Sequence, residues 1–193
     1  MARQIEFFYD YMSPFSYLAD TQLPAIARRT GAEIAYKPAW LAAIMKSTGN
    51  AGPLAIAGKG NYNIVEFQRW AKRYGLSAKF NPHFPFNTIR LLRAAIAAQI
   101  HGRFPAFHSE AFRAIWEREL DPSKEESVRS LLEAAQIDPA LVEGDDIKDR
   151  LRANVDDAIS RGAFGLPTFF VDGEMFWGND RLDFVEEALM LAK

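Results

Sequence analysis

The stretch QIEFFYDYMSPFSYL, residues 4–18, decides the fold because it joins a strand to the start of a helix. Its first six residues are rich in aromatic and β-branched side chains, which favour a strand. Ser13 followed by Pro14 is typical of an N-cap and first helical position, and Gly31 supplies the matching C-terminal signal. A second alternating segment follows at residues 33–38. This order predicts a βαβ unit with a parallel strand pair.

The rest of the chain divides into a helical middle and a β-rich end. Residues 41–140 show helical periodicity broken by loops, and residues 145–160 continue it. Residues 165–177 then predict a hairpin, with Asp172-Gly173 as its turn. Asn179 or Asp180 is expected to cap a final helix. The predicted order is β-α-β, a helical insert, then α-β-β-α.

The composition excludes several classes of protein. The chain has 193 residues, 49% of them hydrophobic, a net charge of −2 and no cysteine. It therefore holds no disulfide, thiolate zinc site, iron–sulfur cluster or dithiol chemistry of its own. The N-terminus lacks the apolar run of a signal peptide, and no segment is long and apolar enough to span a membrane. These observations predict a soluble, cytoplasmic protein.

Positive charge is concentrated in residues 67–109, which contain seven Lys and Arg and no Asp or Glu. Two interpretations stay open: solvated helix faces, or a positive wall that attracts a small anionic ligand. The pI near 6.0 argues against nucleic acid as a partner. The three histidines also fall in this stretch, at spacings that fit no metal template, so no metal site is expected.

Four motifs in this order resemble the 2-hydroxychromene-2-carboxylate isomerases and the related kappa-class glutathione transferases. They are FFYDYMSPFSYL at 7–18, LAAIMK at 41–46, GAFGLPTF at 162–169 and FVDGEMFWGNDR at 170–181. These families form a DsbA-like branch of the thioredoxin superfamily. The resemblance implies an α/β, thioredoxin-like fold with a large all-helical domain inserted after the second strand. We expect a discontinuous thioredoxin-like domain at 1–40 and 141–193, and the insert at 41–140.

The resemblance also implies a site for glutathione. Ser13 and Ser16 stand where thioredoxin-type proteins carry C-x-x-C, so we expect Ser13 to activate a thiol brought by glutathione. A plain helix N-cap is the alternative for Ser13, and support of the helix start is the expected role of Ser16. Leu166 is expected to bind glutathione through its backbone, next to a cis peptide bond at Pro167.

Other residues match the family's ligand-binding positions. Asn179, Asp180 and Arg181 are expected at the γ-glutamyl end of glutathione, with helix capping as the alternative. Asn50 and Lys59, in the loop after the second strand, are expected near the glycyl end or the substrate. Four further candidates for substrate binding lie in the insert, namely Lys46, Phe86, Asn87 and Arg90.

The implied function is a glutathione-dependent isomerase that interconverts 2-hydroxychromene-2-carboxylate and trans-o-hydroxybenzylidenepyruvate. Its partners would be glutathione and a small aromatic carboxylate. The alternatives are a kappa-class-like glutathione transferase and a non-catalytic glutathione-binding protein. The family implies a homodimer, for which Phe104, Phe107 and Phe112 are possible contacts, with core packing as the alternative for each.

Overall fold

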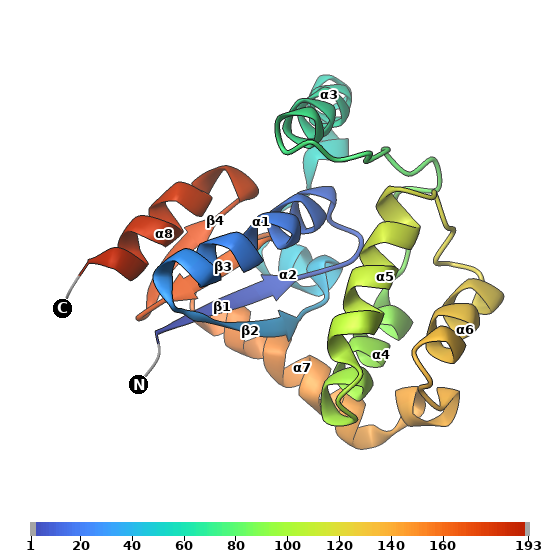
Figure 1. The fold of residues 1–193 in the computed structure, drawn as a ribbon. Helices are drawn as coiled ribbons and strands as arrows, with labels where there is room; N and C mark the ends of the chain where they lie inside the picture. Colours follow the sequence, from blue (N-terminus) through green and yellow to red (C-terminus); the bar gives the residue numbers. More distant parts are fainter. Residues whose placement is uncertain (1–2, 192–193) are drawn as a thin grey trace.

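The computed structural model describes residues 3–191 and shows a mixed sheet flanked by helices (Figure 1). The four strands are β1 (Gln4–Tyr9), β2 (Glu33–Pro38), β3 (Thr168–Val171) and β4 (Glu174–Trp177). The helices are α1 (Pro14–Thr30), α2 (Leu41–Thr48), α3 (Ala57–Arg73), α4 (Ile89–Ile100), α5 (Phe104–Trp116), α6 (Glu125–Ala134), α7 (Asp145–Ser160) and α8 (Leu182–Met190). Short 3₁₀ turns cover Pro53–Ala55, Pro139–Glu143 and Asn179–Arg181.

The sheet has the order β2-β1-β3-β4, with β1 and β2 parallel and the other pairs antiparallel. The parallel pair confirms the predicted βαβ unit. Asp172 and Gly173 have φ values of 50° and 89°, so they form the predicted turn of the β3–β4 hairpin. The thioredoxin-like fold with a helical insertion is therefore confirmed.

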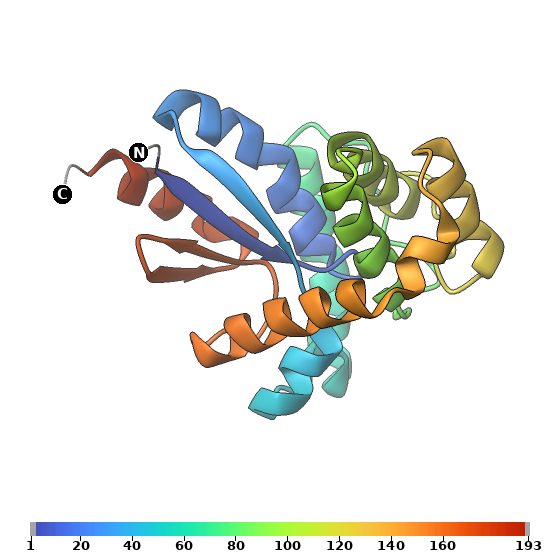
Figure 2. The same ribbon diagram turned by 90° about the horizontal axis from the view of Figure 1, so that it is seen from below.

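Alternation along the strands gives the sheet two apolar faces. Phe7 and Phe169 are cross-strand partners with ring centroids 5.3 Å apart, and they join a core with α1, α8 and the insert. Phe8 and Phe170 point to the opposite face, where they pack with buried residues of α2, α7 and the neighbouring loops. Figure 2 shows α1 and α7 on opposite sides of the sheet.

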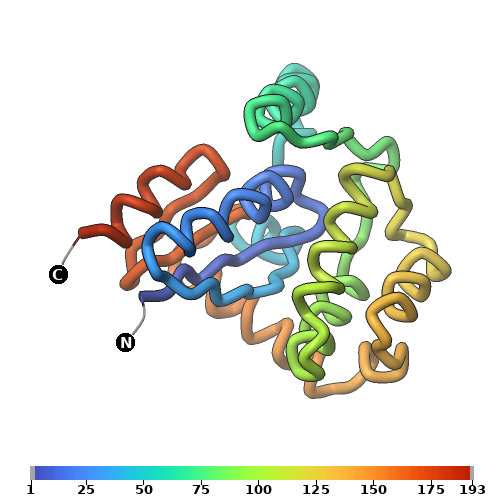
Figure 3. Tube along the Cα trace, in the orientation of Figure 1, coloured from blue at the N-terminus to red at the C-terminus, as the bar shows by residue number. Residues whose placement is uncertain are grey.

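The helical insert leaves the sheet after β2 and returns through α7 (Figure 3). Apart from Ile44 of α2, its buried hydrophobic residues belong to the same core cluster as α1 and one face of the sheet. Phe107 and Phe112 are about 1% exposed, which confirms core packing for these two rings. Phe104 is half-buried against Tyr36 and His108. The division into two domains stays a prediction.

The helix ends show which local signals were correct. Ser13 is the N-cap of α1, Pro14 its first residue, and Gly31 its left-handed C-cap. The final helix is confirmed as α8, but its predicted cap was wrong: residues 179–181 form a 3₁₀ turn, and α8 begins at Leu182 without a side-chain cap. Within residues 3–191, no helix is both long and apolar enough to cross a membrane.

Candidate active site

Ser13 lies at the N-terminus of α1, in the loop that follows β1. Its side chain accepts a hydrogen bond from the Ser16 N–H at 3.1 Å, and its carbonyl accepts from Ser16 and Tyr17. Pro14 has no N–H, so this first turn offers few backbone donors beyond that of Phe15. Ser13 is therefore the N-cap that the sequence predicts, and its hydroxyl lies at the positive end of the helix dipole.

The Leu166–Pro167 peptide is cis, as the resemblance implies. The Ser13 hydroxyl donates to the Leu166 carbonyl at 3.0 Å, although the two residues are 153 positions apart. Both are buried, with exposed fractions of 3% and 6%. The structure thus brings the first and third motifs of the resemblance into direct contact.

The turn after β4 joins the same region. The Gly178 N–H donates to the Pro167 carbonyl at 3.0 Å, which places Asn179 and Asp180 beside the cis-proline loop. Asn179 is buried, and its Nδ2 has no hydrogen-bond partner among the described residues. Asp180 is exposed and pairs with the Arg181 guanidinium at 2.6 Å. The region therefore contains a buried unpaired donor next to an accessible carboxylate.

Asn50 contacts the segment that leads into the cis-proline loop. Its Nδ2 donates to the Phe164 carbonyl at 2.8 Å, and its Oδ1 accepts from the Gly52 N–H at 2.9 Å. Lys46 and Lys59 are exposed and make no ion pair within the described part of the chain. The prediction that Lys59 lies in a loop was wrong, because it belongs to the first turn of α3.

Three of the four predicted insert residues make other contacts in the structure. Phe86 is buried and packs on Trp116 with a centroid distance of 6.1 Å, and Asn87 accepts from the Ile89 N–H. The Arg90 guanidinium lies 3.7 Å from Glu143 and 3.9 Å from Glu125. The structure therefore assigns Phe86 to the core, Asn87 to a helix start and Arg90 to ion pairs in the insert.

Ion pairs of this kind argue against a positively charged surface that attracts a small anionic ligand. Four of the seven basic residues in the stretch 67–109 pair with carboxylates, namely Arg69, Lys79, Arg90 and Arg93. Their partners Glu66, Glu119 and Glu143 all lie outside the stretch. Solvated helix faces are thus the better description for these side chains. No cluster among residues 3–191 has the ligands for a metal ion.

Asp10 is a functional candidate that the sequence reasoning missed. It is fully buried at the end of β1, and its carboxylate accepts from the N–H groups of Met12 and Leu41 and from the Thr88 hydroxyl. Burial raises the pKa of Asp10, and these three hydrogen bonds partly oppose that rise. Asp10 therefore ties the loop before Ser13 to the starts of α2 and α4. An aspartate directly after a buried strand was the available signal.

This geometry defines a thioredoxin-fold protein with a serine at the usual position of the reactive cysteine. The model of the DSBA-like thioredoxin domain family matches residues 4–190. A 2-hydroxychromene-2-carboxylate isomerase of Sphingobium xenophagum is 34% identical over 196 residues, covering 98% of this chain and 100% of the relative. The kappa 1 glutathione S-transferase of Rattus norvegicus is 28% identical over 199 residues, covering 94% and 88%.

A solved structure of 2-hydroxychromene-2-carboxylate isomerase superposes with a TM-score of 0.85 at 31% identity, covering 96% of this chain and 94% of that one. A probable DsbA oxidoreductase from Streptomyces coelicolor has a TM-score of 0.76 at 18% identity, covering 97% and 88%, and supports the fold alone. The chain belongs to the DSBA-like thioredoxin family, in the branch of the 2-hydroxychromene-2-carboxylate isomerases.

Proposed function

We propose that this protein is a glutathione-dependent isomerase that interconverts 2-hydroxychromene-2-carboxylate and trans-o-hydroxybenzylidenepyruvate. The observation that carries the proposal is the contact between the Ser13 hydroxyl and the Leu166 carbonyl at the N-terminus of α1. It places the Ser13 hydroxyl beside the cis-proline loop in a chain that has no thiol of its own. Bound glutathione would supply a thiolate that adds reversibly to the conjugated substrate, permits bond rotation and leaves again unchanged.

The residues around Ser13 fit the groups of glutathione. The Leu166 backbone has the position to pair with an extended peptide, as an added strand does. The buried, unpaired Nδ2 of Asn179 can donate to a carboxylate, and the exposed Asp180 can pair with an α-ammonium. These donors and acceptors match the γ-glutamyl end of the tripeptide.

Ser13 would hold the sulfur in its anionic form. A free thiol has a pKa of about 8.5, so little of it is thiolate at neutral pH. Each unit of pKa depression needs about 1.4 kcal/mol of preference for the anion. The α1 dipole contributes about 0.3–1 kcal/mol and one hydroxyl donor to an anion about 1.5–2 kcal/mol, which together lower the pKa by about one to two units. To donate to sulfur, the Ser13 hydroxyl turns away from the Leu166 carbonyl.

The substrate carboxylate needs a cationic partner near this position. Lys46 and Lys59 are the two candidates that make no ion pair within residues 3–191, and Asn50 lies between them in the chain. Arg90 is a weaker choice because it already pairs with Glu143. We therefore propose Lys46 and Lys59 for the carboxylate, and Asn50 for orienting the loop at Phe164.

The test follows both reactants at once. Purified protein is incubated with 2-hydroxychromene-2-carboxylate, with and without glutathione, while product and free thiol are measured. An isomerase requires glutathione but leaves its concentration constant. Stoichiometric loss of glutathione with a conjugate as product would instead identify a transferase, the activity named for the kappa-class relatives. Glutathione binding without turnover would leave the non-catalytic glutathione-binding protein, and absence of glutathione binding by calorimetry would refute all three.

Two further properties are proposed with this function. Reduced glutathione is abundant in a reducing compartment, so we infer that the protein acts in the cytoplasm. We also infer a homodimer, which light scattering of the purified protein would test. A monomer at all concentrations would contradict the inferred homodimer, and the proposed isomerisation would be unaffected.

A further inference from the structure

A cavity of about 250 Å³ lies at the free edge of the sheet, between β2, α4 and α7. We call it the β2-edge cavity, because the end of β2 forms one wall and the two helices form the others. Its volume lies just below the range for drug-sized ligands, so it suits a small molecule or ion. Neither Ser13, Leu166 nor Asn179 lines it, and it is therefore separate from the proposed glutathione site.

Side chains of the two helices cover the outward carbonyl groups of β2. This strand pairs with β1 on one side only, so alternate backbone groups point away from the sheet. Gln99 Nε2 donates to the Tyr36 carbonyl at 2.8 Å, and Asn154 Nδ2 donates to the Pro38 carbonyl at 2.9 Å. The Tyr36 N–H points to the same side as its carbonyl, where the sheet supplies no acceptor for it. The strand edge therefore offers the cavity a donor, while its carbonyls already accept.

Two cationic side chains line the β2-edge cavity, and neither is paired. Lys37 is half-buried at the end of β2, and Arg150 lies on the face of α7 that carries Asn154 one turn later. Neither cation makes an ion pair or a hydrogen bond within residues 3–191. No Asp or Glu lines the cavity in the described part of the chain. The cavity therefore carries two positive charges and no negative one.

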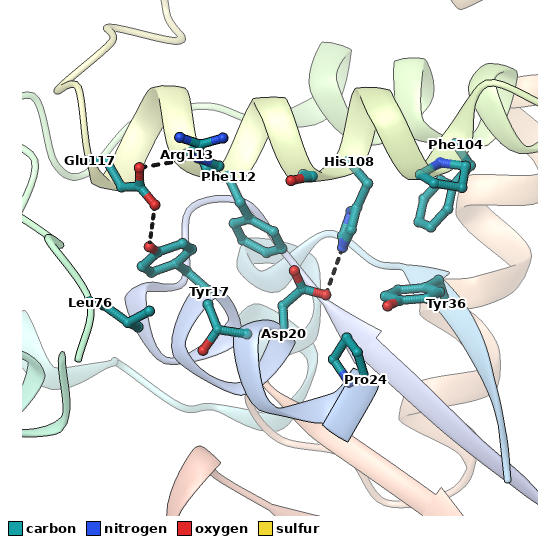
Figure 4. A pocket seen from close by; sticks show the side chains of 13 residues that line it. Tyr17, Asp20, Pro24, Tyr36, Leu76, Phe104, His108, Phe112, Arg113 and Glu117 are labelled. Atoms are coloured by element: carbon teal, nitrogen blue, oxygen red, sulfur yellow. Dashed lines mark hydrogen bonds and ion pairs between the residues drawn. The ribbon is translucent and has the colours of Figure 1, made fainter. Parts of the chain in front are cut away.

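A larger cavity, between α1 and α5, shows the contrast (Figure 4). Its volume is about 390 Å³, but its charged groups already have partners. His108 Nε2 lies 3.0 Å from Asp20 Oδ1, and Glu117 accepts from the Tyr17 hydroxyl and the Arg113 guanidinium. Among the described residues that line it, no unpaired charge is left to select a ligand, whereas the β2-edge cavity has two.

An anion would satisfy the unused donors of the β2-edge cavity. The half-buried ammonium of Lys37 has lost part of its hydration, and an acceptor that replaces this water recovers free energy. The guanidinium of Arg150 can bind two oxygens of one carboxylate or phosphate in a fixed geometry. The acceptors that remain are the amide oxygens of Gln99 and Asn154, which carry no charge. The cavity therefore favours an oxyanion over a cation or a neutral amide.

From these observations we propose that the β2-edge cavity binds a small divalent oxyanion. Lys37 and Arg150 pair with its two charges from β2 and α7, and the Tyr36 N–H donates to one of its oxygens. Phosphate and a short dicarboxylate share this chemistry. A cation is disfavoured by like charge, and a neutral molecule leaves both side chains unpaired. The site is independent of the reaction at Ser13.

The test compares probes that differ in charge. Malonate, malonamide and inorganic phosphate are titrated separately into the full chain at low ionic strength, with calorimetry and backbone amide NMR as readouts. We expect malonate to bind about tenfold more tightly than malonamide, which has the same shape, with amide shifts centred on Tyr36 and Lys37. Tighter binding of phosphate than of malonate would identify a phosphorylated ligand and the reverse a dicarboxylate, and both results support the site. Equal affinity for malonate and malonamide would overturn it.

Variants separate the charge of the cavity from its space. Arg150→Gln and Lys37→Gln should each weaken malonate binding by about tenfold. Arg28→Gln is the matched control, because it removes an exposed, unpaired arginine of α1, and it should leave the affinity unchanged. Ala153→Trp fills the cavity from an exposed position on α7, so it should abolish binding with both cations in place. An equal loss in Arg28→Gln, unchanged binding in Ala153→Trp, or amide shifts confined to the Ser13 region would each overturn the proposal.

Discussion

Replacing Ser13 with alanine tests two roles of one hydroxyl. The side chain accepts from the Ser16 N–H and donates to the Leu166 carbonyl, and both bonds are buried. Loss of an N-cap costs about 1 kcal/mol. Leaving the Leu166 carbonyl without its donor adds about 1–3 kcal/mol. We expect Ser13→Ala to lower the free energy of unfolding by about 2–4 kcal/mol while the protein still folds.

The same change should affect turnover more selectively. A hydrogen bond to an anionic sulfur is worth about 1.5–3 kcal/mol, which corresponds to at least about a tenfold loss of turnover. Isomerisation is measured at saturating glutathione, and stability is measured by urea unfolding of the same preparations. Together the two assays separate lost activity from lost fold.

Ser16→Ala is the matched control. Ser16 is buried three residues away, its Oγ has no partner among the described residues, and its N–H bond to Ser13 does not need the side chain. This variant should keep both stability and turnover close to wild type, because no hydrogen bond is lost. Unchanged turnover in Ser13→Ala, or an equal loss in Ser16→Ala, would refute the role given to Ser13.

Three other changes test the structure. Burial raises the pKa of Asp10, so the folded state binds this proton more tightly, and the free energy of unfolding falls as pH rises through the folded pKa. Asp10→Asn should make this fall smaller in urea titrations from acidic to neutral pH. An unaltered pH profile would contradict the expectation. Arg161→Met removes two hydrogen bonds to Glu6, of 2.8 and 2.9 Å, and a cation–π contact 3.6 Å from the centroid of the Phe170 ring. Chemical denaturation should therefore show a free energy of unfolding lower by about 1–3 kcal/mol. Gly173→Ala places a residue with a side chain at a backbone φ of 89°, so it should lower the free energy of unfolding by about 1–2 kcal/mol in the same assay. Wild-type stability of this variant would contradict the turn geometry.

Local signals explain the parts of the fold that the sequence predicts well. Ser13 and Gly31 act on backbone groups within one helical turn, and Asp172-Gly173 sets a turn between adjacent strands. Such interactions depend on neighbours in the chain, so a single sequence reveals them. The contact between Ser13 and Leu166 was expected only through the family resemblance, because it joins distant segments.

Long-range polar contacts explain most of what was missed. Asp10 meets Thr88, and Asp20 meets His108, across 78 and 88 positions. Asp10 follows a buried strand, which is its one local signal, whereas nothing in the local pattern distinguishes Asp20 from a surface acid. Arg90 was a candidate because of its charge, and the fold places it beside Glu143; its role in substrate binding stays a prediction. Lys59 was assigned to a loop because the glycines around it masked the start of α3.

The central claim is that this protein lowers the pKa of the thiol of bound glutathione. The direct measurement is the ultraviolet absorbance of the thiolate as glutathione bound to the protein is titrated with pH. Our account predicts a thiol pKa about one to two units below the free value of about 8.5. A bound thiol that titrates at or above the free value would contradict it.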